Sequence, residues 1–451
     1  MKNKLKNENK FLKDEYLGSL DLSNIDNELY DKYNVKKGLR NSNGTGVLVL
    51  LTKISDVYGY KIEDGKKIDD EGHLYYRGYD IYNLAKLNKE RFGFERVCFL
   101  ILFSRLPSDD ELLSFHEYLA SEYALPKGFS EDVIFKNCSS SIMNQIQKSI
   151  LSLYSYDTDP DNIDPYETMI KGLKIIAKLP AIISYSYRAK KHYIDDKSLH
   201  IRKPKKDYSL AQNLLYMSRH SGEFSRLESE TLDLALILHA DHGGGNNSTF
   251  ANVVVSSTQT DIYSTIAASL GSLKGPRHGG ANRKAKDMMD SIIKEVGLNA
   301  KDDEIRAVIK KILKKDFFDN SGLIYGIGHA VYTISDPRAI LIKNKCHELA
   351  KMKEKLDIFN FYDKFERIAK EELSHEKGSN IHIATNVDFY SGLTYEILNI
   401  NDDLFTPIFA CARVVGWVAH NIENKLYCDK IIRPAGLYVG ESKKGEFDGE
   451  I

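Results

Sequence analysis

The chain has 451 residues, more than one hydrophobic core usually supports, so we expect two domains or one large domain with an insertion. Its 63 basic and 64 acidic side chains leave a formal net charge of −1, which provides no general field for attracting nucleic acid or an anionic membrane. The five cysteines are scattered and never form a C-x-x-C pair, which argues against a disulfide framework or a zinc motif and favours a reducing compartment.

The amino end and the apolar runs predict no membrane segment. Residues 1–16, "MKNKLKNENKFLKDEY", lack the apolar stretch of a signal peptide, and their acidic residues argue against a transit peptide. The longest apolar run, "VCFLILF" at residues 97–103, is far too short to span a bilayer. We therefore expect a soluble, cytoplasmic protein without a membrane or nucleic-acid partner.

A short β element is predicted near the amino end, and helices over most of the remaining chain. Residues 44–81 combine β-branched residues with glycine-rich turns, which favours a small sheet. Beyond them apolar residues recur at spacings of three and four, and the chain has only 10 prolines, a pattern typical of helices. At residues 106–108 one helix gives way to another, with Ser108 as the N-cap and Glu111 completing a capping box. The expected fold class is mainly α.

The composition shifts toward lysine and glutamate between about residues 283 and 376. Segments such as "IRAVIKKILKKDFF" and "KMKEKLDIFNFYDKFERIAKEEL" carry apolar residues at helical spacing among many charges. Helices of this kind usually expose their charged face, so we expect them to cover a smaller domain.

Four stretches share an unusual trait, an ionisable residue beside glycines or prolines where a helix should end. They are "LHADHGGGNNSTF", "KGPRHGGAN", "YGIGHAVYTISDPRA" and "ATNVDFYSG", and the residues of interest in them are His239, His242, His278, His329, Arg338 and Asp388. Glycine permits close backbone approach to a ligand, and helix ends supply oriented N–H groups and partial charge. A single histidine near a turn is more often structural, but the set together predicts an active site built from helix ends.

Three arginines stand in apolar or proline-marked surroundings: Arg338 in "SDPRAI", Arg413 in "FACARVVGW" and Arg433 in "IIRPAGLYVG". Burying a guanidinium is costly and it cannot lose its proton, so each needs an anionic partner. A carboxylate of the chain itself or an anionic ligand would serve, and the sequence leaves both possibilities open.

These stretches resemble those of the citrate synthase family. The matching pieces run from "LYYRGYDI" at residues 74–81 through the four stretches above to "DLFTPIFACARVVGWVAH" and "IIRPAGLYVG", in the family's order over nearly the whole chain after about residue 45. The resemblance implies a mostly helical homodimer with two domains. Residues 1–281 and 388–451 would form the large domain, and residues 282–387 an inserted small domain on the coenzyme A side.

The resemblance also implies a reaction, the condensation of acetyl-CoA with oxaloacetate followed by hydrolysis of citryl-CoA to citrate and CoA. His278 would hydrogen-bond the thioester oxygen, Asp388 would remove a methyl proton, and His329 would act on the carbonyl oxygen of oxaloacetate. Oxaloacetate would be held by His242, Asn246, Arg338, Arg413 and Arg433, the last reaching across from the partner subunit.

Elementary chemistry agrees with these roles. The α-proton of a thioester is too weakly acidic for a carboxylate alone, so the developing enolate needs a positioned hydrogen-bond donor. A neutral imidazole fixed at a helix terminus, as predicted for His278, can donate in this way. The two carboxylates of oxaloacetate match the forked geometry of arginine. Catalytic residues at the edges of a separate domain would allow closure that excludes water.

No tightly bound cofactor and no metal are expected, since coenzyme A enters as the thioester substrate. By the resemblance, its adenine would lie against the main chain around Gly326 and Gly328. Two features depart from the family's pattern. Ala330 and Thr333 stand where many relatives carry basic residues, which leaves open which residues hold the coenzyme A phosphates. The triple glycine at residues 243–245 replaces larger residues of some relatives and leaves the backbone of that loop undefined.

Three alternatives remain at this point. A 2-methylcitrate synthase would use the same residues with propionyl-CoA, and one extra methylene is worth only about 1–3 kcal/mol. A metal-dependent hydrolase would use the histidines of "HADH", although Ile237 stands where a metallo-β-lactamase motif needs another histidine and the preceding residues predict a helix. A regulatory acyl-CoA-binding protein on the same scaffold would have no use for a general base such as Asp388.

Overall fold

The computed structural model comprises two compact units, which are described separately. The first combines Met1–Val49 with Arg433–Ile451, and its helices are α1 (Lys2–Ser19), α2 (Glu28–Lys32) and the short 3₁₀ turn η1 (Lys37–Leu39). The second, Leu50–Ile432, contains all the remaining helices and strands assigned below. The structure describes residues 2–20, 24–41, 43–64, 66–378 and 381–440.

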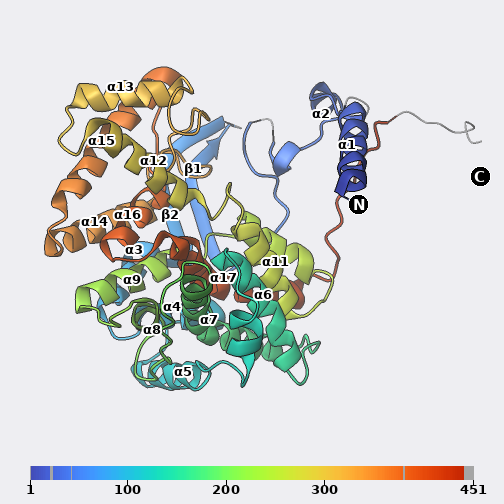
Figure 1. Ribbon diagram of the computed structural model, residues 1–451, viewed down its shortest axis with the longest axis vertical. Helices are drawn as coiled ribbons and strands as arrows, with labels where there is room; N and C mark the ends of the chain where they lie inside the picture. The colour runs from blue at the N-terminus through green and yellow to red at the C-terminus, as the bar shows by residue number, and fades with distance from the viewer. Residues whose placement is uncertain (1, 21–23, 42, 65, 379–380, 441–451) are drawn as a thin grey trace, which may run out of the picture. The chain divides into compact units, whose positions relative to one another are not determined.

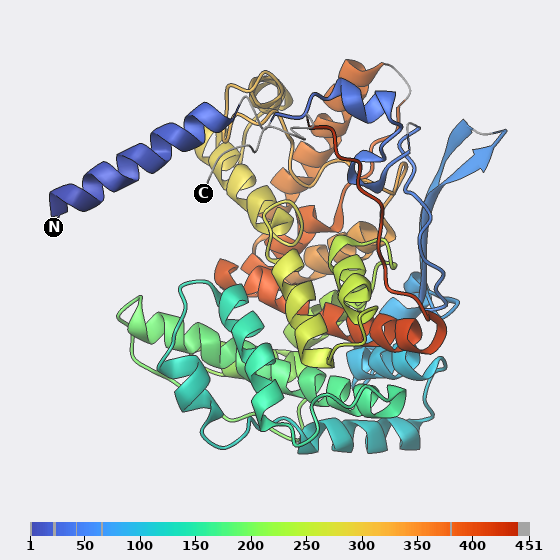
Figure 2. The same ribbon diagram turned by 90° about the vertical axis from the view of Figure 1, so that its right-hand side faces the viewer.

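The second unit begins with a small antiparallel sheet, which confirms the predicted β element. Its strands, in the order β1–β2–β3, are β1 (Ser55–Glu63), β2 (Lys66–Tyr76) and β3 (Tyr79–Asp80). Ser55 pairs with Tyr76, and the register shifts between Tyr58 and Tyr60. Figure 2 shows the β1–β2 hairpin at the edge of this unit, with its tip standing clear of the helices.

The rest of the second unit is helical, as the apolar spacing predicts. The helices are α3 (Ile81–Leu84), α4 (Gly93–Phe103), α5 (Asp109–Ser121), α6 (Ile142–Leu153), α7 (Pro165–Tyr193), α8 (Leu210–Ser218), α9 (Arg226–His239), α10 (Asn247–Ser256), α11 (Ile262–Leu273), α12 (Ala281–Val296), α13 (Asp302–Leu313), α14 (Pro337–Met352), α15 (Leu356–Lys377), α16 (Val387–Ile397) and α17 (Phe405–Tyr427). Shorter 3₁₀ or π turns are η2 (Ala85–Lys89), η3 (Ser130–Phe135), η4 (Tyr154–Tyr156) and η5 (Asp402–Leu404).

Helix α17 is the central helix of this unit. It is buried almost all around, from Phe405 to Asn424, and includes the fully buried Trp417. A helix that is apolar on every side belongs in the core of a large domain. It packs against α4, α7, α9, α10 and α11, which surround it in Figure 1.

The charged helices that the sequence places after residue 283 are confirmed as α12 to α15. In α13 the apolar residues Ile305, Val308, Ile309 and Ile312 are buried while the lysines between them are exposed. Figure 1 shows α12 to α15 gathered at one end of the second unit and α5, α7 and α8 at the other. Whether residues 282–387 form a separate domain stays a prediction, and residues 379–380 and 441–451 of the predicted ranges lie outside the described residues.

The predicted helix boundary at residues 106–108 is also confirmed. The Ser108 hydroxyl accepts the Glu111 N–H at 3.3 Å, and the Glu111 carboxylate accepts the Ser108 N–H at 2.8 Å, a reciprocal capping box at the start of α5. None of the described helices is long and apolar enough to cross a bilayer.

Candidate active site

His278 stands in the turn between α11 and α12, where the sequence predicts an abrupt helix end. The Gly279 N–H donates to the Leu273 carbonyl at 2.9 Å, and a side chain at position 279 would collide with that carbonyl, so the turn requires glycine. His278 Nε2 lies 3.0 Å from Ser248 Oγ, and Nδ1 has no partner among the described residues. Burial, and after it the charge of Arg413, lowers the pKa of His278 to about 4, so the ring is neutral at pH 7.

The loop that carries His329 is fastened to the segment leading into α16. Gly326 and Gly328 have positive φ angles of 83° and 100°, a conformation that favours glycine. The Gly326 carbonyl accepts the Asn386 N–H at 2.9 Å, and the Gly328 N–H donates to the Ala384 carbonyl at 2.8 Å. The positive φ angles explain why both positions are glycine, and the backbone hydrogen bonds bring the predicted catalytic loop to the start of α16.

The His329 ring is held in one tautomer. Its Nδ1 accepts the backbone N–H groups of Val331 at 3.0 Å and Tyr332 at 3.1 Å, so the ring proton lies on Nε2. Nε2 is 3.4 Å from Arg338 Nη2 and 3.9 Å from Asp336 Oδ2. Burial lowers the pKa of His329 to about 4, with Asp336 opposing this shift and Arg338 adding to it. The neutral ring therefore has its N–H on the side of the Asp336 carboxylate, while the Arg338 guanidinium, which has only donors, cannot accept it.

Asp388 is the second residue of α16, whose N-cap is Asn386. The Asn386 side chain accepts the Asp388 N–H at 3.2 Å. The Asp388 carboxylate is partly exposed and has no hydrogen-bond or ion-pair partner within the described ranges. Burial raises its pKa to about 6, against the opposing charges of Arg338 and Arg413. An accessible carboxylate with a raised pKa suits a general base.

Arg338 is paired within its own chain. The Asp336 carboxylate accepts Arg338 Nε at 3.0 Å and Nη2 at 2.8 Å, and it also accepts the backbone N–H groups of Arg338 at 3.0 Å and Val387 at 3.2 Å. Burial alone lowers the pKa of Arg338, but the Asp336 charge outweighs it and the net shift is upward. Sequence reasoning missed Asp336, although an Asp directly before Pro337 at a helix start was a signal for an N-cap.

Arg413 is different, because no carboxylate among the described residues forms an ion pair with it, although the charge of Asp241 partly offsets the effect of burial on its pKa. It is fully buried on α17, and its Nε donates to the His239 carbonyl at 2.7 Å. Nη1 and Nη2 have no hydrogen-bond partner among the described residues, and the guanidinium lies 4.6 Å from the Phe409 ring centroid. Burial lowers the pKa of Arg413 to about 10, so it is still charged at pH 7. A buried charge without a partner is costly, and this one is suited to an anionic ligand.

His242 and Asn246 lie in the loop between α9 and α10. His242 Nε2 is 3.1 Å from the Tyr332 hydroxyl, and its ring centroid is 5.8 Å from that of His329. Burial lowers the pKa of His242 well below its usual value. Asn246 is the N-cap of α10, and its Oδ1 accepts the hydroxyl of Ser248, the residue that also contacts the His278 ring.

The structure brings most of the predicted site residues into one cluster. The charge of Arg413 acts on the pKa values of His242, His278 and Asp388, and hydrogen bonds join the remaining segments to these. The residues gathered in this way are His242, Asn246, His278, Gly326, Gly328, His329, Arg338, Asp388 and Arg413. Arg433 belongs to the other unit and is exposed there, so its role stays a prediction. The described residues contain no group of three or more His, Cys, Asp or Glu arranged to hold a metal ion.

Thr333, one of the departures from the family's pattern, has a structural use. Its hydroxyl donates to the Gly59 carbonyl and accepts the Asp70 N–H at 3.2 Å. Two residues later, the Ser335 hydroxyl accepts the Gly72 N–H at 3.3 Å. The β1–β2 hairpin thus holds the segment between His329 and Arg338, and no local signal in the sequence revealed this contact.

Comparison with known proteins identifies the family. Residues 41–435 match the family model described as citrate synthase, C-terminal domain. The chain is 33% identical to the citrate synthase of Haloferax volcanii, covering 90% of this chain and 96% of that protein. It is 35% identical to citrate synthase 2 of Bacillus subtilis, covering 84% of this chain and 92% of that protein. It is also 31% identical to a 2-methylcitrate synthase of Shewanella oneidensis, covering 82% of this chain and 90% of that protein.

Solved structures agree with the sequence relatives. The citrate synthase of Thermoplasma acidophilum, in a ternary complex with carboxymethyl coenzyme A and oxaloacetate, is 25% identical with a TM-score of 0.74, covering 91% of this chain and 97% of that one. The citrate synthase of Pyrobaculum aerophilum is 32% identical with a TM-score of 0.72, covering 88% of this chain and 91% of that one. The predicted fold and family are confirmed, and the chain belongs to the citrate synthase family.

Proposed function

We propose that this chain condenses acetyl-CoA with oxaloacetate and hydrolyses the resulting citryl-CoA to citrate and CoA. The observation that carries the proposal is a buried Arg413 guanidinium whose charge acts on the Asp388 carboxylate, which has a pKa of about 6, with neither group in an ion pair among the described residues. The first is suited to an anionic substrate and the second to proton removal. Membership of the family and the names of the relatives support the same reaction.

In the proposed mechanism Asp388 takes a methyl proton from acetyl-CoA. The enolate oxygen that develops receives a hydrogen bond from the neutral His278 ring, which lowers the cost of forming the negative charge. The enolate carbon then attacks the carbonyl carbon of oxaloacetate, whose oxygen receives a hydrogen bond from the Nε2 N–H of His329. The alkoxide that forms takes that proton, and the proton that Asp388 removed returns through solvent to the His329 ring. Water cleaves the thioester of citryl-CoA, which releases citrate and the CoA thiol.

Oxaloacetate is bound by the groups that surround the unpaired guanidinium. Arg413 receives one carboxylate, since its two Nη groups are free of other partners. Arg338 and His242 lie beside it and supply further donors, with Asp336 holding the Arg338 fork in place. Asn246, and Arg433 from the partner subunit, complete the proposed set.

The coenzyme A side and the assembly follow the family's pattern in this proposal. The adenine lies against the main chain at Gly326 and Gly328, and residues 282–387 move as a small domain that closes over the substrates. The enzyme is a cytoplasmic homodimer in which each active site takes Arg433 from the other subunit.

The acyl preference has a second candidate, because a 2-methylcitrate synthase is among the relatives. The deciding experiment follows CoA release with a thiol reagent in the presence of oxaloacetate, using acetyl-CoA and propionyl-CoA at matched concentrations. We expect kcat/KM to be at least about tenfold higher with acetyl-CoA, within the range that one methylene can supply. A preference for propionyl-CoA would assign the alternative, and no release of CoA with either thioester would overturn the proposed function.

A further inference from the structure

One face of α17 is pressed against the loop that carries His242. Arg413, Gly416 and His420 are spaced three and four residues apart, so they share this face. The Arg413 Nε donates to the carbonyl of His239 at 2.7 Å, and His420 Nε2 lies 3.3 Å from Asp241 Oδ2. The loop that follows α9 is therefore held by both ends of this helical face.

Gly416 allows the close approach between these two contacts. A Cβ at position 416 would collide with Asp241 Oδ1 and would lie 2.7 Å from the Ala240 carbonyl oxygen. A glycine inside a helix is unfavourable by about 1 kcal/mol relative to alanine, so its presence in this buried helix has a packing reason. The Asp241 carboxylate therefore packs directly against the backbone of α17 at Gly416, and this contact is called the Asp241 seat below.

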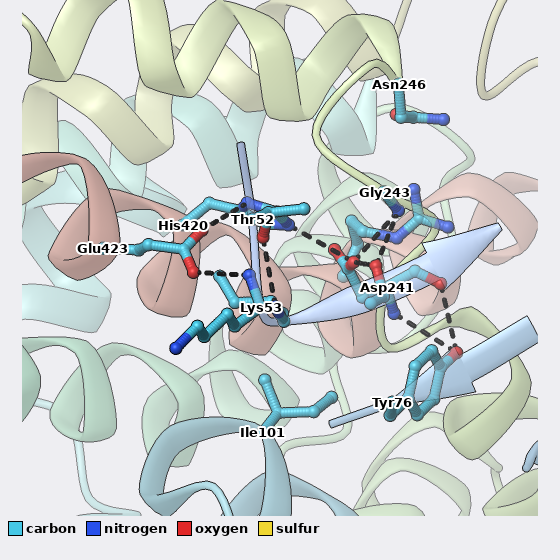
Figure 3. Close-up of polar contacts among 12 residues, drawn as sticks. Thr52, Lys53, Tyr76, Ile101, Asp241, Gly243, Asn246, His420 and Glu423 are labelled. Carbon is cyan, nitrogen blue, oxygen red and sulfur yellow. Dashed lines mark hydrogen bonds and ion pairs between the residues drawn. The ribbon is translucent and has the colours of Figure 1, made fainter. Parts of the chain in front are cut away.

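Asp241 ties its own loop to two distant segments of the chain, and Figure 3 shows its contacts with Gly243 and His420. Its Oδ2 accepts hydrogen bonds from the Ser55 hydroxyl and from the Gly243 N–H at 3.0 Å. The same oxygen lies 3.3 Å from His420 Nε2. Ser55 opens strand β1, Gly243 follows the substrate-binding histidine, and His420 belongs to α17. The side chain is fully buried, and its Oδ1 has no hydrogen-bond partner in the described part of the chain.

Glu423 lies on the other side of the His420 ring from Asp241 and supports the contact between His420 and Asp241. His420 Nδ1 lies 3.9 Å from Glu423 Oε2, and Glu423 Oε1 accepts the Lys53 N–H at 2.8 Å. The segment before β1 is thus bound to the same helix, and the hairpin that begins there holds Thr333 in the catalytic loop. The Asp241 carboxylate is fully buried, so it acts on the site through the segments that it holds.

From this geometry we infer that Asp241, seated on Gly416 and His420, is a positioning residue that sets the distance between the Arg413 guanidinium and His242 and so determines the affinity for oxaloacetate. The inference rests on the proposed function. Arg413 and the Asp241 seat lie on one rigid helix, whereas His242 follows Asp241 directly in the loop. A change in the contact between Asp241 and Gly416 therefore moves His242 relative to Arg413.

The test is Asp241→Asn, which keeps the size of the side chain but replaces one of its two acceptor oxygens by an NH₂ group. That group cannot accept the hydrogen bonds of Ser55, Gly243 and His420. The affinity of the purified full chain for oxaloacetate is measured by isothermal titration calorimetry, and kcat at saturating oxaloacetate by CoA release. We expect the dissociation constant to rise at least about tenfold, which corresponds to about 1.4 kcal/mol. The value of kcat should change much less, because Asp388 and His278 are not touched.

The matched control is Glu228→Gln at the start of α9, the helix that precedes the loop of Asp241. Glu228 is also a buried carboxylate with cationic partners, Arg219 at 2.8 Å and Lys353 at 2.9 Å, but it lies at the opposite end of α9 from the loop. A merely structural role for Asp241 would make both variants alike, with lower thermal stability and unchanged affinity for oxaloacetate. Emission from Trp417, the only tryptophan, reports whether each variant is folded.

Three further variants keep the test decisive if Asp241→Asn does not fold. Gly416→Ala retains every hydrogen-bonding group but displaces the Asp241 seat, and it should also weaken oxaloacetate binding at least about tenfold. His420→Gln keeps an N–H donor for Asp241 and should retain near-normal affinity for oxaloacetate. His420→Leu removes the donor and should lower that affinity. Unchanged affinity for oxaloacetate in folded Asp241→Asn and Gly416→Ala would overturn this inference but not the proposed function. Failure of the unaltered protein to bind oxaloacetate would overturn the proposed function as well.

Discussion

Asp388 is the residue on which turnover should depend most directly. Its carboxylate is accessible and unpaired, and Asp388→Asn removes the base while keeping the size of the side chain and the Asn386 cap. We expect kcat to fall about 10²–10⁴-fold with little change in oxaloacetate affinity, since loss of a general base typically costs this much. The measurement is exchange of the acetyl-CoA methyl protons with a keto-acid analogue bound. Near-normal exchange in the variant would assign the base to another group.

The pH dependence of the reaction should show one acidic limb. Burial raises the pKa of Asp388 to about 6, and a base must be deprotonated, so log kcat/KM for acetyl-CoA should fall with unit slope below about pH 6. His278 and His329 have pKa values of about 4 and stay neutral through this range, so they add no second limb there. A rate that stays constant down to pH 5 would contradict the assignment.

Arg413 should show opposite effects on function and on stability. Arg413→Met removes a buried charge that forms no ion pair with a described residue, so the melting temperature of the ligand-free protein should stay the same or rise despite the loss of the hydrogen bond to the His239 carbonyl. The KM for oxaloacetate should rise about 100-fold, the loss expected for two charge-assisted hydrogen bonds.

A suitable control for Arg413→Met is Arg188→Met. Arg188 is also buried, and its Nε and Nη2 have no hydrogen-bond partner among the described residues, but it lies on α7 outside the cluster of site residues. Oxaloacetate should raise the melting temperature of the unaltered protein and of Arg188→Met but not of Arg413→Met. Equal stabilisation of all three by oxaloacetate would mean that Arg413 does not bind the substrate.

At the scale of helices, a buried carboxyl pair joins α4, α8 and α9. Glu95 Oε1 accepts the Leu210 N–H at 2.7 Å, and Asp233 Oδ1 accepts the Phe94 N–H at 3.3 Å. Burial raises the pKa of Glu95 to about 7, and burial followed by the Glu95 charge raises the pKa of Asp233. The folded protein therefore holds protons here that the unfolded chain releases at lower pH.

This pair predicts a loss of stability on the alkaline side. Since the folded pKa of Glu95 is raised from 4.5 to about 7, its contribution is fully present below pH 4.5 and is lost as the pH rises through 7, by roughly 3 kcal/mol. Glu95→Gln keeps the acceptor for the Leu210 N–H and cannot ionise. Urea unfolding at pH 5.5, 7 and 8.5 should show a smaller decline in the free energy of unfolding for this variant. The same decline in both proteins would exclude the pair as its cause.

At the scale of the whole molecule, the proposed sharing of the site between subunits can be tested by complementation. Arg433→Ala and His278→Ala chains should each have little activity. After subunit exchange, each heterodimer would contain one site with both residues intact, so the mixture should be more active than either parent. If exchange is demonstrated and the mixture stays inactive, Arg433 serves its own subunit.

Much of the local architecture was predictable from the sequence, because its causes lie within a few residues of one another. The capping box of Ser108 and Glu111 depends on a spacing of three, and the break before His278 depends on glycine and proline within one turn. The amphipathic pattern of α13 and the β-branched residues of β1 likewise act locally. Resemblance to the family then supplied the residues that we propose to be catalytic.

What only the tertiary structure decided is which of these groups are satisfied by the chain itself. The sequence left open whether Arg338 and Arg413 pair with carboxylates of the protein. The structure pairs Arg338 with Asp336 and leaves both Nη groups of Arg413 without a partner. The contact between Asp241 and Gly416 could not be predicted from the sequence either, since those residues are far apart in the chain. Such contacts depend on how helices pack, and no short stretch of sequence contains both sides of the contact.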